Sequence, residues 1–203
     1  MEKKDLKKQY KQLYSCPAET PIVVDVPEMQ FLMCDGKGAP DSPHFTRAIE
    51  ALYSLSYTIK FACKKGPLQI DYGVMPLEGL WWADDMNDFS SGNKQNWKWT
   101  LMIMQPDFIT EEMVDQATEQ LKNKKKTENL EAVRLEKMQE GKCAQIMHMG
   151  PFSEEAETIA KLHAFIGSAG HKLSGKHREI YLSDMRRTAP EKLKTIIRQP
   201  FLP

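Results

Sequence analysis

The stretch "TIIRQPFL", residues 195–202, closes the sequence and resembles "TLMIMQPDF", residues 100–108, near its middle. Both stretches begin with threonine, continue with mostly apolar residues and reach a Gln-Pro pair, as a buried strand followed by a turn would. Working outward from each stretch, the order strand, helix, strand, strand is expected twice. The sequence therefore predicts an internal duplication of a β-α-β-β module.

The first half contains the clearest helix of the sequence. A run rich in Val, Ile and Phe at residues 21–36 predicts one long strand, or two strands joined by a bend, and "DGKGAP" ends it with turn residues. Apolar spacing then predicts a helix over residues 45–64, before strands at 70–82 and 97–106 and a connecting helix at 110–126 capped by Thr110. The core face of the helix at residues 45–64 is expected to hold Phe45, Ala48, Ile49, Leu52, Ser56, Ile59 and Cys63.

The second half repeats this order. Two strands are expected over residues 130–150, a helix over 151–167 with Ser153 as its N-cap, and further strands at 177–187 and 191–201. The predicted core face of this helix holds Ala156, Ile159, Ala160, His163 and Ile166.

The pattern predicts an α+β fold: an antiparallel sheet with helices on one side, two halves related by a pseudo-twofold axis, and a ligand cleft where the halves meet. The repeats are expected at residues 20–107 and 130–203 of one domain, 20–203. A helical extension, residues 1–19, is expected to precede them and to dock through Leu6, Tyr10 and Leu13.

The composition excludes several classes of protein. With 203 residues and 41% hydrophobic content, a packed core is expected, and 28 basic residues balance 28 acidic ones, so direct nucleic-acid binding is not expected. No apolar run is long enough to cross a bilayer, and the basic N-terminus lacks the apolar core of a secretory signal. The four cysteines and five histidines show no metal-ligand spacing, so we expect reduced thiols, a cytoplasmic location and neither metal nor cofactor.

The strand "HREIYLSD", residues 177–184, has a polar pattern that needs an explanation. Alternation places Ile180 and Leu182 on a core face with Arg178, and Glu179 with Tyr181 on the other face. This second face either lies in water, with Glu179 paired to a nearby arginine, or lines a cavity. In a cavity, burial would raise the pKa of Glu179, which could then meet a cation or orient a water as a general base.

Several aromatic residues and a second acid are further candidates for the site. Trp81 and Trp82 are adjacent, so at most one of them faces a given pocket, and Trp99 shares a strand face with Trp97. Tyr53, Tyr57 and Phe61 form a second aromatic row on the first helix, and Glu78 is either a second site carboxylate or a surface or turn residue. Core packing accounts equally well for part of this aromatic set.

Five phrases in order carry a resemblance to a known family: "FLMCDGKGAP", "ALYSLSYTIKF", "PLEGLWW", "WKWTLMIMQPDFIT" and "EIYLSDMRRTAPEKLKTIIRQP". Together they are similar to the GyrI-like small-molecule-binding family, from about Ile22 to the C-terminus. The resemblance implies the duplicated fold, a ligand pocket between the halves, and a pocket acid at Glu179 in a motif similar to "EIYL". Related regulators add a DNA-binding helix-turn-helix, for which the N-terminus here is too short, so a stand-alone member is expected.

Three functions follow as hypotheses. The first is binding of a hydrophobic, aromatic or cationic small molecule, with charge from Glu179, support from Tyr181 and walls from Tyr53, Tyr57, Phe61, Trp81 or Trp82, and Trp99. The second, which the resemblance implies, is a hydrolase that opens the cyclopropane ring of DNA-alkylating natural products, a detoxification. In this enzyme Glu179 would activate a water, and Tyr181 or an aromatic wall would stabilise the leaving phenolate-like system. The third is a module that binds and masks a protein partner. For each of these functions, the protein is expected to be a monomer or a homodimer.

Overall fold

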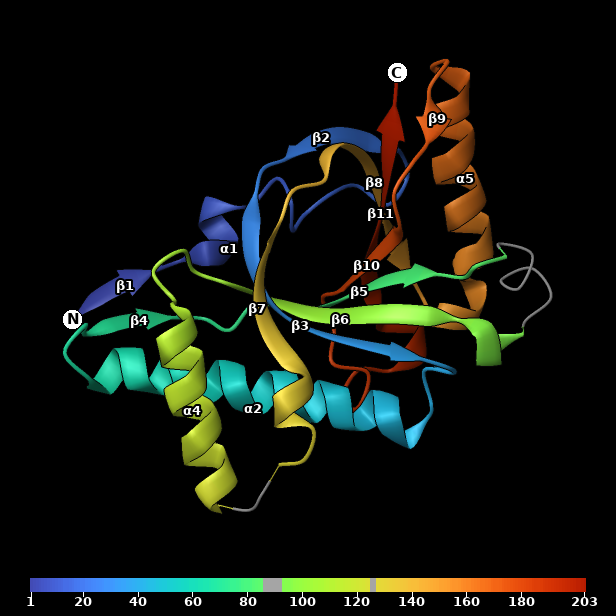
Figure 1. The fold of residues 1–203 in the computed structure, drawn as a ribbon. Helices are drawn as coiled ribbons and strands as arrows, with labels where there is room; N and C mark the ends of the chain where they lie inside the picture. Colours follow the sequence, from blue (N-terminus) through green and yellow to red (C-terminus); the bar gives the residue numbers. More distant parts are fainter. Residues whose placement is uncertain (86–92, 125–126) are drawn as a thin grey trace. The chain divides into compact units, whose positions relative to one another are not determined.

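The computed structural model describes residues 1–85, 93–124 and 127–203, which form two compact units (Figure 1). The first unit comprises Met1–Gln9, Met29–Leu77 and Trp82–Met138. The second unit comprises Tyr10–Glu28, Glu78–Trp81 and Gln139–Pro203. Both combine antiparallel strands with helices, so the predicted α+β class is confirmed.

The first unit is built on β3 (Met29–Lys37), which pairs antiparallel with β6 (Lys98–Gln105) and with β7 (Val133–Met138). Phe31 lies opposite Met104 on β6 and Glu136 on β7, which fixes both registers. The expected run at residues 21–36 is thus two strands, and its first part, β2 (Ile22–Val26), belongs to the second unit. A short parallel pair, β1 (Glu2–Lys4) with β4 (Ile70–Tyr72), completes the strands of the first unit.

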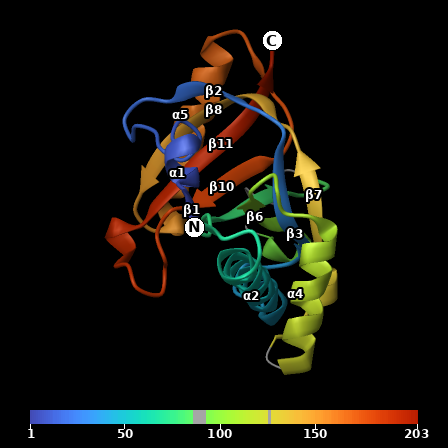
Figure 2. The same ribbon diagram turned by 90° about the vertical axis from the view of Figure 1, so that its left-hand side faces the viewer.

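Two helices pack in the first unit, α2 (Pro43–Lys65) and α4 (Glu111–Lys124) (Figure 2). The Ser42 side chain accepts a hydrogen bond from the Phe45 backbone N–H at 3.2 Å, and Gly66 follows the last turn, so the predicted helix is confirmed. Thr110 caps α4 as predicted, by accepting from the Met113 N–H at 3.3 Å. Residues 125–126 of the expected connecting helix, and residues 86–92 of the expected polar loop, lie outside the described residues.

The expected helical extension at residues 1–19 is wrong for most of its length. Only α1 (Leu6–Gln9) is helical, and Glu2–Lys4 forms a strand. The backbone that follows α1 forms short turn bonds, such as that from the Tyr14 N–H to Tyr10 O at 3.2 Å, and then bonds to strands of the second unit. Pro17 O accepts from the Met147 N–H at 2.9 Å, and Gln12 O accepts from the Gln145 side chain at 2.9 Å.

The second unit is a twisted antiparallel sheet with the strand order β2, β8, β11, β10, β5. Glu179 on β10 lies opposite Ile197 on β11, and Tyr181 lies opposite Thr195, so these four side chains share one face. The bounds of the strands not yet given are β5 (Leu77–Trp82), β8 (Gly141–Met149), β9 (Lys172–Leu173), β10 (His177–Tyr181) and β11 (Lys194–Leu202).

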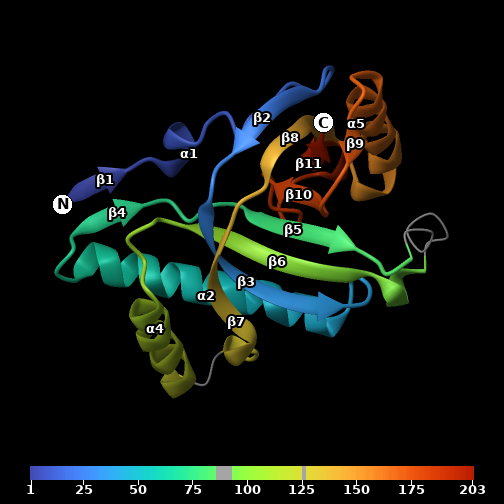
Figure 3. The ribbon, with the colours of Figure 1, turned by 45° about the horizontal axis from the view of Figure 1, so that its top comes forward.

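Helix α5 (Glu155–Ser168) covers this shared face and lies alongside β9 and β11 (Figure 3). Leu162 and Ile166 pack with Ile197 and its neighbours in a core free of solvent. The predicted core face of this helix is partly wrong, because Ala156 and Ala160 are exposed. The buried stripe runs instead through Glu155, Ile159, Leu162 and Ile166, at helical spacing.

Ser153, the predicted N-cap of this helix, makes no capping bond, because a 3₁₀ turn (Phe152–Glu154) leads directly into α5. Similar turns occur at Lys94–Asn96, Leu130–Ala132 and Pro190–Lys192.

The element order confirms the duplicated module. The series β3, α2, β5, β6 is followed by β8, α5, β10, β11, with the short strands β4 and β9 at equivalent places after each helix. In the parts of the chain that the structure describes, none of the helices combines the length and apolar character needed to cross a bilayer.

Candidate functional site

Strand β10 carries charged side chains on both faces, and the two faces differ in how deeply their side chains are buried. Arg178 and Ile180 are fully buried, whereas His177, Glu179 and Tyr181 alternate with them and are half-buried. The alternation predicted for this strand is therefore confirmed. It ends at Tyr181, so Leu182 lies beyond the strand and is only half-buried.

Glu179 is held by hydrogen bonds from both of its strand neighbours on the same face. The Tyr181 hydroxyl donates to Oε2 at 2.6 Å, and His177 Nε2 lies 3.2 Å from Oε1. The side chains of His177 and Glu179 each remain 15% exposed. The carboxylate is thus oriented by its neighbours and still reachable from solvent.

Aromatic rings surround the Tyr181 side of this group. Trp81 Nε1 donates to the Tyr181 hydroxyl at 3.0 Å, and the Phe152 ring meets the Tyr181 ring edge-on, with centroids 5.7 Å apart. This arrangement requires glycine at position 79. A Cβ there would lie 2.8 Å from Trp81 Nε1 and 3.1 Å from the Tyr181 oxygen, closer than such contacts allow.

A second carboxyl group, that of Glu155 at the start of α5, lies next to Glu179. It is 5% exposed, and its Oε1 has no hydrogen-bond partner among the residues that the structure describes. Burial, and then the charge of Glu179, raise the pKa of Glu155 to about 9, against a smaller lowering effect of the Thr195 hydroxyl. Glu155 therefore carries its proton at neutral pH.

Two further groups of the cluster stay neutral. Burial and the neighbouring Glu179 charge raise the pKa of Tyr181 well above its usual value. On α5, burial and the nearby His177 lower the pKa of His163, whose Nε2 is buried and has no partner in the described part of the chain. The face thus presents one carboxylate, one carboxylic acid, a phenol and imidazoles beside aromatic rings.

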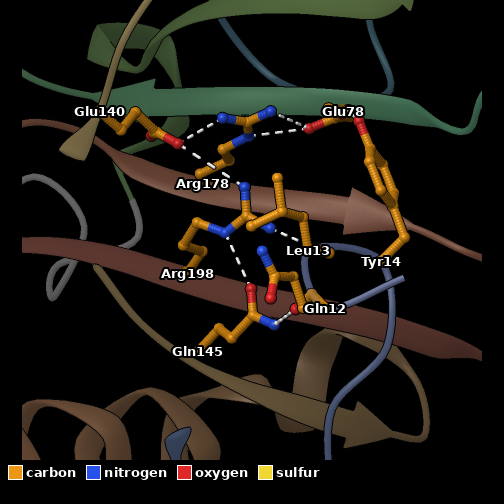
Figure 4. Close-up of polar contacts among 8 residues, drawn as sticks. All are labelled: Gln12, Leu13, Tyr14, Glu78, Glu140, Gln145, Arg178 and Arg198. Atoms are coloured by element: carbon orange, nitrogen blue, oxygen red, sulfur yellow. Dashed lines mark hydrogen bonds and ion pairs between the residues drawn. The ribbon is translucent and has the colours of Figure 1, made fainter. Parts of the chain in front are cut away.

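The opposite face of β10 holds a buried ionic network (Figure 4). Arg178 donates to Glu78, with Nε at 2.8 Å, and forms a second ion pair with Glu140. The Tyr14 hydroxyl donates to the other oxygen of Glu78 at 2.7 Å, and Arg198 lies 3.7 Å from Glu140. Each charge has an opposite partner, so the network holds β10 against β5 at the register that places Glu179 beside the aromatic rings.

The structure brings together three of the candidates named from the sequence: Glu179, Tyr181 and Trp81. The interpretation of Glu78 as a surface or turn residue is wrong, because it is fully buried in the ionic network. Five further candidates belong to the first unit: Tyr53, Tyr57, Phe61, Trp82 and Trp99.

The candidates of the first unit include a buried core residue and a partly exposed aromatic row. Trp99 is fully buried against Phe45, with ring centroids 5.1 Å apart, and is a core residue of its unit. Tyr53, Tyr57 and Phe61 stack along α2 at centroid separations of 6.3 and 6.4 Å, and nearly half of the surface of Tyr57 and of Phe61 is exposed.

Sequence reasoning missed Glu155 and His177. Glu155 stands at helical spacing from Ile159, Leu162 and Ile166, and an acid within an apolar stripe was the available signal for it. His177 precedes Glu179 by two positions, and this spacing puts both on one strand face. No group of three or more His, Cys, Asp or Glu residues that could hold a metal ion occurs within residues 1–85, 93–124 and 127–203.

The fold is that of an α+β domain with a duplicated module, and comparison with known proteins identifies its family. The family model of the GyrI-like small molecule binding domain matches residues 19–201, and the chain belongs to this family. No curated protein matches the chain.

Solved structures of similar proteins agree with this assignment. An uncharacterized conserved protein from Listeria innocua is 43% identical, with a TM-score of 0.88, over 98% of this chain and 99% of its own. A protein from Listeria innocua described as a hydrolase is 42% identical, with a TM-score of 0.87, over 99% of this chain and 100% of its own. The C-terminal domain of EcmrR shares the fold at 13% identity, with a TM-score of 0.58, over 90% of this chain and 97% of its own.

Proposed function

We propose that this protein hydrolyses a hydrophobic, electrophilic small molecule at the face of β10 that carries Glu179. The observation that carries the proposal is a half-buried carboxylate, oriented by Tyr181 and His177 and set beside the rings of Trp81 and Phe152. Membership of a small-molecule-binding family supports a small molecule as the ligand. The description of a 42% identical protein as a hydrolase supports turnover.

The chemistry of such a site follows from its groups. Glu179 accepts a hydrogen bond from a water and takes a proton from it as the water oxygen attacks an electrophilic carbon. Tyr181 and His177 keep the carboxylate in the required orientation during the attack. Trp81 and Phe152 provide aromatic surface for a ring-bearing substrate.

A cyclopropane joined through a spiro carbon to a conjugated cyclohexadienone has the properties that this site requires. Its ring strain makes a saturated carbon electrophilic, and its conjugated ring suits aromatic contacts. When the water oxygen bonds to that carbon, one ring carbon–carbon bond breaks, and its electron pair converts the dienone into a phenol-type product. DNA-alkylating natural products with this unit are the substrate class that we infer, and hydrolysis removes their reactivity.

Binding without turnover is the second candidate function, and the same geometry favours it for one kind of ligand. A carboxylate beside tryptophan and tyrosine rings attracts an aromatic cation through charge and cation–π attraction. The third hypothesis, masking of a protein partner, would use the exposed row Tyr57 and Phe61 on α2.

Turnover of the parent spiro-cyclopropyl cyclohexadienone by the wild-type protein tests the proposal. The phenol product is followed by its absorbance, and binding of an unreactive saturated analogue is followed by tryptophan fluorescence. Glu179→Gln keeps the shape of the side chain but removes the base, so we expect turnover to fall about 100-fold or more with analogue affinity little changed. Glu191→Gln, at an exposed acid of the same unit, is the matched control.

Two results would count against hydrolysis. Saturable binding of the analogue with no phenol formed by the wild-type protein would leave the binding function alone. Equal turnover by wild type and Glu179→Gln would show that the base lies elsewhere.

A further inference from the structure

The carboxyl group of Glu155 is buried, and the mechanism above assigns no role to it. Glu155 is the first residue of α5, it belongs to the buried stripe of that helix, and one of its oxygens has no partner among the described residues. A buried oxygen without a partner loses its hydration and gains no hydrogen bond in return. Unsatisfied groups of this kind are rare in folded proteins, and the position of this one next to Glu179 gives a reason for its presence.

Every element packed around Glu155 contributes a polar group. From β10 come Glu179, Tyr181 and His177, and from β11 comes the buried Thr195. His163 lies two turns further along α5 and is neutral. Glu179 is the acidic group whose charge acts on Glu155. Two interacting carboxyl groups that share one proton divide into an acid and a base.

We propose that Glu155 is the proton donor of the hydrolysis and delivers its proton to the oxygen that becomes the phenol of the product. The proposal rests on the function proposed above. It assigns the second half of the reaction to a residue on α5, whereas the first half uses a residue on β10. The site is then complete only when α5 is docked on the sheet.

The proton and electron balance closes with these two groups alone. The water oxygen forms a bond to the electrophilic carbon and gives one proton to Glu179. The ring carbon–carbon bond breaks, its electron pair moves through the ring to the carbonyl oxygen, and that oxygen takes the proton of Glu155. Glu179 then holds a proton, Glu155 is ionised, and transfer of this proton from one to the other restores the starting state.

The lasting protonation of Glu155 is what makes it suitable as a donor. Its pKa of about 9 keeps the proton in place at neutral pH, and the charge of Glu179 contributes to that value. Once Glu179 has taken a proton from water, this contribution disappears and Glu155 becomes a stronger acid. The proton is therefore released more readily at the stage of the reaction at which it is needed.

Kinetics of Glu155→Gln provide the test, with Glu157→Gln as the matched control, because Glu157 is an exposed acid on the same helix. Ring-substituted spiro-cyclopropyl cyclohexadienones that yield phenols of different acidity serve as substrates. We expect Glu155→Gln to lower kcat about 100-fold for the least acidic phenol and much less for the most acidic one. An acidic phenol leaves well without a donor, so only a proton-donating role predicts this graded loss.

Two further readouts separate the donor role from a structural one. Wild-type turnover should fall as the pH rises through about 9, where Glu155 loses its proton, and the Glu155→Gln variant should show no such fall. Infrared spectra of the free protein at neutral pH should contain a carboxylic acid C=O band that Glu155→Gln lacks and Glu157→Gln retains, whether or not the protein turns over a substrate.

The outcomes distinguish this inference from the proposed function. If wild type turns over the dienones and Glu155→Gln loses the same factor for every phenol, or nothing, the donor role is overturned and Glu179 as base still stands. An infrared spectrum without the protonated carboxyl band also overturns it. If the wild-type protein forms no phenol, the proposed function itself has failed.

Discussion

Two neighbouring charged residues of β10 lie in different environments. Arg178 is buried and has carboxylates on two sides, whereas Glu179 points to the other face and keeps part of its surface in solvent. A buried charge is tolerated when its partners stay in place, and removing one partner leaves an uncompensated charge. Loss of a partner of the first residue is therefore expected to destabilise the protein, whereas the second residue can be reached from solvent.

Glu78→Gln is expected to destabilise the protein by about 3–5 kcal/mol, because Arg178 loses a buried partner. Urea unfolding measures the change. Glu131→Gln is the control, since Glu131 pairs with Lys122 at the surface and is 81% exposed, so about 1 kcal/mol or less is expected. Similar losses for the two variants would show that the buried network contributes no more than a surface pair.

Glu155 predicts a pH dependence of stability. Its folded pKa, about 9, lies above that of an unfolded glutamic acid, so the folded state holds more protons than the unfolded state between the two values. Stability from this group is complete at low pH and is lost as the pH rises towards 9, by at most about 1.4 kcal/mol per pH unit.

Thermal unfolding of Glu155→Gln should therefore show a smaller loss of stability than wild type between pH 5 and 8, a window that lies roughly inside the range of the shift. Glu157→Gln should follow the wild-type curve. Parallel curves for all three proteins would mean that Glu155 is ionised in the folded state.

Gly79→Ala tests the aromatic side of the site. Its methyl group would displace Trp81 or Tyr181, so we expect loss of the indole N–H hydrogen bond, seen as a shifted indole signal in NMR spectra, and slower turnover. Gly73→Ala adds a methyl group where no atom lies within 4 Å and is the control. An unchanged indole signal in Gly79→Ala would contradict the packing described here.

At the scale of elements, local signals in the sequence predicted what is local in the structure. Helix α2 was predicted to within about two residues, because Gly66 and Pro67 mark its end and one apolar face runs through it. The core face of α5 was partly misassigned, since the buried stripe runs through Glu155 and Leu162 instead of Ala156, Ala160 and His163. An apolar pattern alone does not predict that an acidic residue belongs to a buried stripe.

Contacts between distant segments could not be predicted in this way. Arg178 and Glu78 are 100 residues apart, and their pairing depends on the register of β10 against β5. The same applies to residues 12–17, whose backbone bonds to β8 and β11 and thereby prevents the expected N-terminal helix.

Tyr14→Phe measures the contribution of this N-terminal segment. The variant leaves one oxygen of Glu78 without its donor, and we expect a loss of about 1–3 kcal/mol in the free energy of unfolding. Tyr57→Phe, at an exposed ring, should change it little. Equal and small effects would show that the segment is not a structural part of the second unit.

At the scale of the whole molecule, the repeated order of strands and helices was sufficient to predict the fold class, because it is a property of many residues. The family was indicated by the resemblance of five sequence phrases in order, and the family model confirms it. The site was only partly predictable. Glu179 and Tyr181 were predicted to share a strand face, and Trp81 was one of two alternatives for the aromatic wall, whereas Glu155 and His177 were missed. The contribution of Tyr53, Tyr57, Phe61, Trp82 and Trp99 to ligand binding stays a prediction.

Tyr57→Ala tests this prediction for the row on α2. If the Tyr57 ring forms part of the ligand site, the binding free energy of the unreactive saturated analogue should weaken by about 0.5–1.5 kcal/mol. Leu68→Ala, at another exposed apolar residue of the first unit, is the control. An unchanged affinity in both variants would show that the ring of Tyr57 is not part of the ligand site.

The turnover of the double variant Glu155→Gln/Glu179→Gln tests most directly whether the two carboxyl groups form one catalytic pair. Groups that act as a unit give losses that do not multiply, so we expect the double variant to lose no more than about the factor lost by Glu179→Gln alone. Losses that multiply in the double variant would show two independent effects. Such a result would contradict the account of a shared acid and base.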